Sequence, residues 1–173
     1  MVRLKHRYIL FDIVYPPSGN PQSGEQRRKF AAFSRSPKDC LLQLHSASPS
    51  SVSARNIVLL LKRVVEDHFG ESAAGTVGLL ITVKYFSNKT STGIVRCSRT
   101  DFEKLVAAMA LVNKIENLDV VMRCVHVSGT IRKCEEFSIL RNRQLMMDMG
   151  KGEDTDTLKN LMRHFGRGDH EQT

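Results

Sequence analysis

The chain has 173 residues, with 41% hydrophobic and 25% charged side chains, which suits one compact domain followed by a short tail. Its longest apolar runs, 77–83 and 105–112, are far shorter than the roughly 20 residues that cross a bilayer, which excludes a membrane-spanning protein. The net charge is +8, and residues 150–173 hold only 4 basic and 5 acidic residues, so the body carries the excess. This charge fits a polyanionic partner, although simple solubility explains it equally well.

The chain contains four cysteines, and no two of them are spaced CxxC: Cys40, Cys97, Cys124 and Cys134. The basic N-terminal segment lacks the cleavage site of a signal peptide, so we expect reduced thiols. Cys124 and His126 are two apart in a predicted strand, should share a face, and could form half of a zinc site. No second pair of ligands accompanies them, which favours small buried core residues.

In chain order, β-branched and aromatic residues predict a strand over 3–15, with Arg3, Lys5 and Arg7 on one face and Tyr8 on the other. Ser, Pro, Gly and charged residues dominate 16–49, which indicates an insertion or mobile connector. Apolar residues spaced three or four apart predict a helix at about 51–69, ended by Gly70.

Two strands over 76–86 and 92–97 are then predicted to form a hairpin, in which alternation requires either Tyr85 or Phe86 to face the helices. Ser98 is expected to cap the next helix, with Asp101 in its first turn. Three further elements complete the chain: a strand over 118–127, a helix over 130–148 and a short weak helix around 157–165.

The order β-α-β-β-α-β followed by helices predicts an α/β protein, an α+β sandwich of the ferredoxin-like split type. A four-stranded antiparallel sheet with two helices on one face and an additional C-terminal helix is expected. Residues 1–149 should form a single RNA-binding domain that includes the insertion at about 16–49, and 150–173 a polar tail. Fold alone does not decide function, because enzymes and metal carriers share this architecture.

Cations and hydroxyls suited to phosphate and ribose oxygens occur in three segments, namely the first strand, the hairpin and the helix after Gly129. Polar hairpins are usually plain turns, and an Arg132–Glu136 pair within the helix is an equally good interpretation there. The candidate RNA-binding residues are Arg3, Lys5, Arg7, Lys84, Asn88, Lys89, Thr90, Ser91, Arg96, Arg99, Arg132 and Lys133.

Catalytic patterns find little support in the sequence. The acidic residues are scattered, the six histidines show no partner pattern, and Gly-rich phosphate loops do not occur. We therefore predict no catalytic residue, no metal ligand and no cofactor in the protein itself.

Three long strings, in matching order and spacing, resemble the Pop-five family of protein subunits of ribonuclease P and ribonuclease MRP, in its fungal form. They are MVRLKHRYIL at 1–10, YFSNKTSTGIVRC at 85–97 and VSGTIRK at 127–133. The resemblance covers about 1–15 and 50–149, whereas 16–49 and the tail have no recognised counterpart.

The resemblance implies a non-catalytic subunit of an endoribonuclease whose RNA holds Mg²⁺ and performs the hydrolysis. It implies removal of the 5′ leader from precursor tRNA, processing of precursor rRNA, and a place in the nucleus and nucleolus. The implied partners are ribonuclease P RNA, ribonuclease MRP RNA and other protein subunits, especially a TIM-barrel-like one, with no membrane. Because the paired stacking aromatics of RNA-recognition motifs are missing, contact with RNA backbone and shape is favoured.

Two other functions stay open. The chain could be a protein–protein scaffold that reaches RNA only through its partner, with Phe137, Leu140 and Leu145 as interface. It could also be a protein nuclease or transferase with its own site, which cleavage of precursor tRNA by the RNA-free protein would establish.

Overall fold

The computed structural model describes residues 5–17 and 23–150, and the chain divides after Ser138 into two compact units. The described part of the second unit is the end of one helix. The helices and strands are β1 (His6–Val14), α1 (Gly24–Arg35), α2 (Pro37–Leu44), α3 (Ala54–Leu80), β2 (Thr82–Ser87), β3 (Thr92–Ser98), α4 (Phe102–Leu111), β4 (Lys114–Ile115), β5 (Leu118–Asp119), β6 (Val121–Ser128) and α5 (Ile131–Gly150). Among the described residues, no helix is long and apolar enough to cross a membrane.

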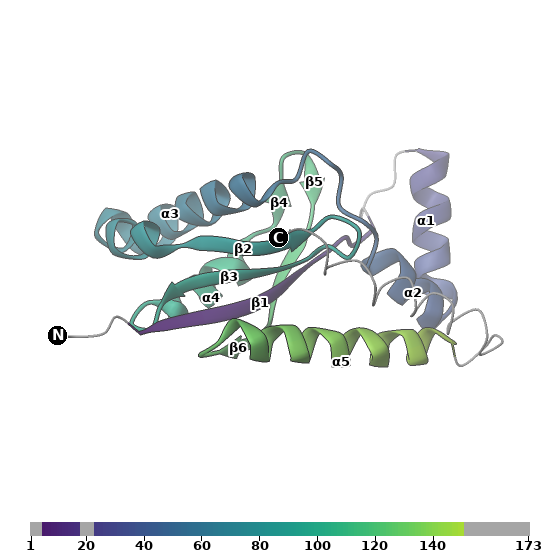
Figure 1. Ribbon diagram of the computed structural model, residues 1–173. Helices are drawn as coiled ribbons and strands as arrows, with labels where there is room; N and C mark the ends of the chain where they lie inside the picture. The colour runs from purple at the N-terminus through teal and green to yellow at the C-terminus, as the bar shows by residue number, and fades with distance from the viewer. Residues whose placement is uncertain (1–4, 18–22, 151–173) are drawn as a thin grey trace. The chain divides into compact units, whose positions relative to one another are not determined.

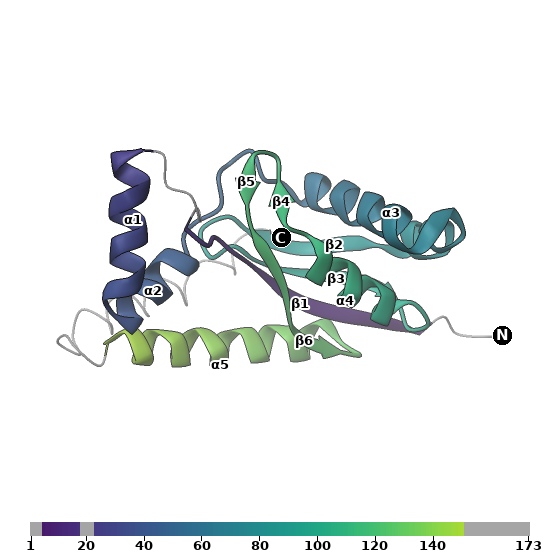
Figure 2. The same cartoon turned by 180° about the vertical axis from the view of Figure 1, so that it is seen from behind.

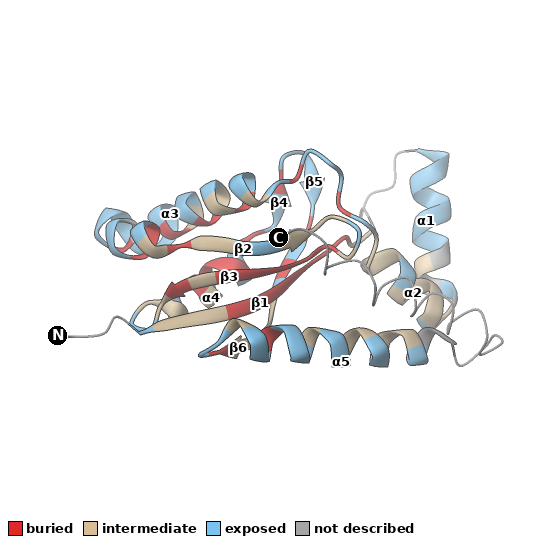
Figure 3. Cartoon of the chain, viewed as in Figure 1, coloured by how far each residue is buried: buried red, intermediate tan, exposed pale blue. Residues whose placement is uncertain are grey.

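The first unit is built on a four-stranded antiparallel sheet with the strand order β2-β3-β1-β6 (Figure 1). Helices α3 and α4 cover one face of it (Figure 2), and Ile9, Phe11, Leu61 and Met109 are fully buried in the core between them. The central strands β1 and β3 are mostly buried (Figure 3). This arrangement confirms the predicted ferredoxin-like α+β fold.

The start of α5 covers part of the opposite face of the sheet. Leu10, Ile94 and Cys134 form a second buried cluster there, and the rings of His126 and Phe137 stack at 4.4 Å between centroids. Because β1 is buried on both faces from Ile9 to Val14, its sequence there is apolar apart from Asp12 rather than alternating.

The insertion between β1 and α3 contains two helices that the sequence analysis did not predict. Helix α1 begins with a capping box between Ser23 and Gln26, and α2 begins at Pro37 and is capped by the Ser36 hydroxyl, which accepts from the backbone N–H of Asp39. Most of α1 is exposed, so its sequence has little of the apolar periodicity that reveals a helix.

Several predicted boundaries differ from the structure. Helix α3 continues beyond Gly70, where φ is +82° and the helix is kinked, so 76–80 is helical rather than strand. Asp101, not Ser98, is the residue before α4, because the Ser98 hydroxyl accepts from the backbone of Thr100 instead. The predicted strand over 118–127 is divided into β5 and β6. Arg3 and the helix predicted at 157–165 lie outside the described residues.

A bulge changes the faces of two neighbours in β6. The β1–β6 register shifts between Leu10 and Phe11, so that Leu10 pairs with His126 and Phe11 with Cys124. Cys124 packs against the core, whereas His126 stacks on Phe137 on the other side. The prediction that the two share a face is therefore wrong, because a bulge inserts one extra residue. In the described ranges, no three His, Cys, Asp or Glu side chains come together as a metal site.

Candidate nucleic-acid interface

Antiparallel pairing places the start of β1 beside the end of β3. His6 pairs with Ser98, and the backbone N–H of Arg99 donates to the carbonyl of Lys5 at 3.0 Å. The side chains of Lys5 and Arg99 are both exposed. Two of the predicted candidates, from distant parts of the sequence, are therefore neighbours at one end of the sheet.

The first turn of α5 lies at this same end, because Tyr8 pairs with Ser128 just before the helix begins. The Nη1 atom of Arg7 lies 3.7 Å from the place that a Cβ on Gly129 would take. Arg96 pairs with Tyr8 in the adjacent ladder. The candidate side chains gathered here, called the basic end below, are Lys5, Arg7, Arg96, Arg99, Arg132 and Lys133.

Most cations of the basic end have no acidic neighbour. Among the described residues, carboxylate oxygens lie within 4.0 Å of none of five basic-end side chains: Lys5, Arg7, Arg96, Arg99 and Lys133. Arg132 does pair with Glu136 at 3.0 Å, which confirms the predicted pair within the helix, but both side chains are well exposed. The positive charge is thus left largely uncompensated.

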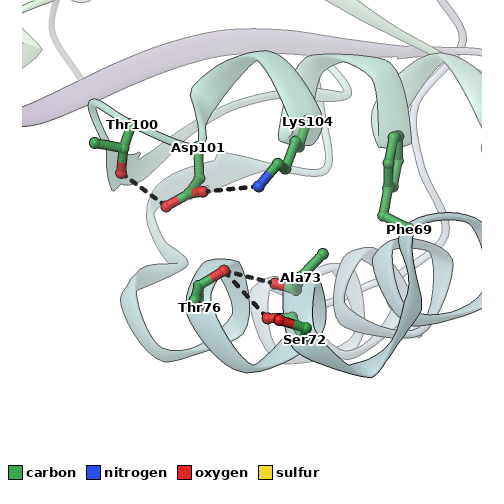
Figure 4. A pocket seen from close by; sticks show the side chains of 7 residues that line it. All are labelled: Phe69, Ser72, Ala73, Thr76, Thr100, Asp101 and Lys104. Atoms are coloured by element: carbon green, nitrogen blue, oxygen red, sulfur yellow. Dashed lines mark hydrogen bonds and ion pairs between the residues drawn. The ribbon is translucent and has the colours of Figure 1, made fainter.

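Asp101 is close in sequence to Arg99 of the basic end, but its carboxylate contacts other residues. Its carboxylate accepts from the Thr100 hydroxyl at 2.9 Å and pairs with Lys104 at 3.3 Å (Figure 4). These residues line a hollow of about 480 Å³ between α3 and α4. On the opposite wall, the Thr76 hydroxyl bonds the Ala73 carbonyl at 3.1 Å. The polar groups of this hollow therefore bond to one another rather than neutralise Arg99.

The turn of the hairpin lies at the other end of the sheet. The backbone N–H of Ile13, near the end of β1, donates to the carbonyl of Ser91 at 2.8 Å. Ser91 is 1% exposed, and its hydroxyl donates to the Ser46 carbonyl at 2.7 Å. The structure thus separates four candidates from the basic end: Asn88, Lys89, Thr90 and Ser91. Lys84 is exposed in the middle of β2.

Asn88 holds the loop before α3 against the hairpin. This is a structural role, whereas the sequence predicted an RNA-binding one. Its Nδ2 donates to the carbonyls of Pro49 and Val52, at 2.7 and 2.8 Å. We expect Asn88→Ala to lower the free energy of unfolding by about 1–2 kcal/mol, because the exposed carbonyl of Pro49 and the partly buried carbonyl of Val52 both lose their donor. Lys89→Ala, at an exposed neighbour, should change it by less than about 0.5 kcal/mol. Urea denaturation compares the two, and equal effects would contradict the structural role.

Three of the four thiols are poor nucleophiles in this fold. Burial raises the pKa of Cys97 to about 11, with Asp101 raising it further and Arg7 lowering it. Burial also raises the pKa of Cys124 and of Cys134. These thiols are protonated at neutral pH, which removes the nucleophilic form.

Two tyrosines on the sheet were not among the predicted candidates. Phe86 stacks on Phe11 inside the core, at 6.3 Å between ring centroids, while Tyr85 is 45% exposed. This confirms that one ring of the pair faces the helices. Tyr8 is half-buried on the face opposite α3 and α4. Strand alternation indicated the face of Tyr8, but gave no sign that part of that face is left uncovered.

The fold and the basic end define a class of protein, a small ferredoxin-like α+β domain with uncompensated positive charge at one end of its sheet. The chain belongs to the Rpp14/Pop5 family, whose model matches residues 7–139. This confirms the resemblance found in the sequence.

Curated relatives match most of the chain. It is 40% identical over 147 residues to ribonuclease P/MRP protein subunit POP5 of Saccharomyces cerevisiae, which covers 84% of this chain and 80% of that protein. It is 36% identical over 143 residues to the POP5 subunit of Schizosaccharomyces pombe, with coverages of 83% and 89%. The human POP5 subunit is 28% identical over 151 residues, with coverages of 85% and 76%.

Proposed function

We propose that this chain is a non-catalytic protein subunit of ribonuclease P and ribonuclease MRP that binds and stabilises their catalytic RNA. The observation that carries the proposal is the basic end, where cations from β1, β3 and α5 meet and, among the described residues, only Arg132 has an acidic partner. The names of the relatives, which are subunits of ribonuclease P/MRP, support it.

The physical role follows from the charge of folded RNA. A compact RNA crowds its phosphates, and their repulsion opposes the active arrangement. Cations held on a rigid sheet reduce that repulsion without reorganising, and each contact releases counterions. In this proposal the RNA carries the Mg²⁺ and cleaves precursor tRNA and precursor rRNA, in the nucleus and nucleolus. A TIM-barrel-like subunit is the expected protein partner.

The test is the salt dependence of binding between the purified full chain and ribonuclease P RNA. With about six phosphates neutralised, a plot of log affinity against log salt should have a slope near −4 to −5. Changing Lys5, Arg99 and Lys133 together to Ala should make the slope shallower by about 2 and weaken binding about tenfold to a hundredfold. The melting temperature should stay unchanged, because these side chains are exposed and make no ion pair among the described residues.

A matched triple variant at Arg28, Arg55 and Arg63 removes the same charge from exposed helical positions away from the sheet end. Its salt slope should stay close to that of the wild type. A slope near zero for the wild-type protein, or equal loss in both triple variants, would rule out binding through the basic end.

The scaffold alternative rests on exposed apolar side chains of α5, of which Phe137 is 37% and Leu140 62% exposed. If the chain reaches RNA only through a protein partner, ultraviolet crosslinking in the assembled particle should give no RNA adduct at the basic end. Cleavage of precursor tRNA by the RNA-free protein would instead support a nuclease of its own.

A further inference from the structure

A bulge in the edge strand β2 holds an aromatic ring in solvent. Val83 packs against the core and Phe86 stacks on Phe11, although residues three apart in a regular strand face opposite sides. The register shift between Val83 and Tyr85 resolves this, because it leaves both intervening residues outside. Lys84 and Tyr85 are accordingly both exposed, on the face turned away from α3 and α4. Bulges commonly re-aim side chains in this way.

Strand pairing places the side chains of Ile94, Arg96 and Tyr8 on this same face. Tyr85 pairs with Ile94, which belongs to the buried cluster on the side away from α3 and α4. Two positions along β3, Arg96 pairs with Thr82 on one side and with Tyr8 on the other. From strand spacing and rise, the Cα atoms of Tyr8 and Tyr85 are roughly 12 Å apart, with Arg96 between the two rings.

Arg96 has an unused donor on this face. Its Nε is buried and has no hydrogen-bond partner among the described residues, and no carboxylate there pairs with its guanidinium. A buried donor left unpaired costs about 1–3 kcal/mol, so such a group in a native fold calls for an acceptor. A phosphate or base oxygen lying across the strands would pair with this half-buried side chain after the guanidinium turns outward to meet it.

We infer that this face binds an unpaired stretch of RNA, with one base stacked on Tyr85, another on Tyr8, and Arg96 bonded to an oxygen between them, so that bases are contacted in addition to the backbone contact expected from the sequence. The inference deepens the proposed function and rests on it, since it names a single-stranded element as ligand. Lys84, beside Tyr85, would contact the neighbouring phosphate. Side chains at the start of α5 pack over Leu10, so the site is confined to β2, β3 and the adjoining part of β1.

Single-stranded RNA suits this face better than duplex RNA or a protein surface does. In a duplex the base faces are stacked on one another and cannot reach an aromatic ring on a sheet. A protein surface would bury Lys84 and Arg96 and would have to supply well-placed acids to offset their desolvation. Unpaired RNA brings both the π-faces and the negative charge, the combination typical of single-strand binding proteins.

Tyrosine fluorescence offers a direct test, because the chain has three tyrosines and no tryptophan. The third, Tyr15, is buried and donates to Ser48 at 2.8 Å. Titration of the full chain with a ten-nucleotide oligoadenylate should quench the emission saturably. Tyr85→Leu should weaken binding by roughly 5-fold to 100-fold, as the loss of one base stack does. Tyr85→Phe, which keeps the ring, should bind within twofold of the wild type, and both variants should melt like it.

The outcomes separate this inference from the proposed function. If Tyr85→Leu binds as tightly as the wild type while the salt slope persists, the stacking site is wrong and the basic end stands. If the wild type binds neither oligoadenylate nor ribonuclease P RNA, both fail. Equal quenching by duplex RNA of the same length would also overturn stacking. So would a Tyr85→Leu variant that loses other protein subunits but keeps its affinity for oligoadenylate.

Discussion

Replacing Gly93 with alanine should lower the free energy of unfolding by about 2–3 kcal/mol. A Cβ at this position of β3 would lie 2.5 and 2.8 Å from the Cζ and Cε1 atoms of Phe11 and 2.9 Å from the carbonyl oxygen of Tyr85. The Phe11 ring is fully buried and stacked on Phe86, so it has no free space to move into. Calorimetry should show a melting temperature lower by roughly 5–10 °C.

Gly75→Ala is the matched control for this effect. Gly75 lies in α3 with nothing within 4 Å of the place that a Cβ would take, and its φ is not positive. Alanine there should raise the free energy of unfolding by about 0.5–1 kcal/mol, because it is the better helix former. If Gly93→Ala melts with the wild type, the packing of Phe11 against β3 is looser than the structure shows.

The ion pair between Asp12 and Arg123 should respond unequally to removal of its two partners. Asp12 is 1% exposed, and its two carboxylate oxygens accept from Nε and Nη2 of Arg123 at 3.0 and 2.7 Å. The Arg123 side chain is 48% exposed, and the hydrogen bonds that it donates to Asp12 raise its pKa. Arg123→Met, which leaves a buried carboxylate without its guanidinium, should cost about 2–4 kcal/mol at pH 7. Asp12→Asn, which frees an arginine that can turn to water, should cost about 1 kcal/mol.

The pH dependence gives a second readout of this pair. A buried carboxylate that has lost its guanidinium destabilises the fold only while it is charged, so Arg123→Met should recover part of its stability as the pH falls and Asp12 takes up a proton. The difference from the wild type should therefore be larger at pH 7 than at pH 4.5 in urea denaturation. A pH-independent cost, or a larger cost for Asp12→Asn, would show that the salt bridge does not stabilise the fold in this way.

The order of strands and helices was predictable because it depends on long-range periodicity. The apolar spacing of Ile57 and Leu61 indicated α3, and alternation sorted the residues of β1 onto two faces. Local exceptions were not predictable. A bulge beside Phe11 reversed the expected face of His126, and a kink at Gly70 let α3 continue where a stop was expected. The bulge and the kink are backbone conformations that depend on tertiary packing rather than on the local sequence.

The candidate site was predicted in part. Residue type pointed to Lys5, Arg99 and Lys133, which the structure brings to one end of the sheet. It also pointed to Asn88 and Ser91, whose hydrogen bonds are spent inside the fold at the other end. Composition shows that a side chain can donate to a phosphate, but only the pairing of strands shows whether that donor is already used. Because β3 runs antiparallel to β1, the turn of the hairpin lies near the end of β1, far from its start.

The hydrogen bonds from Asn88 and Ser91 to residues 46–52 fix the chain before α3 to the hairpin end of the sheet, opposite the basic end. At one end of the sheet the backbone that enters α3 is hydrogen-bonded to the hairpin, so the start of α3 is held in place independently of α1 and α2. The connection between β1 and α3 could therefore lengthen or shorten without shifting the basic end at the opposite end of the sheet. A lineage can therefore add contacts of its own on one side of such a protein while the opposite side keeps its geometry.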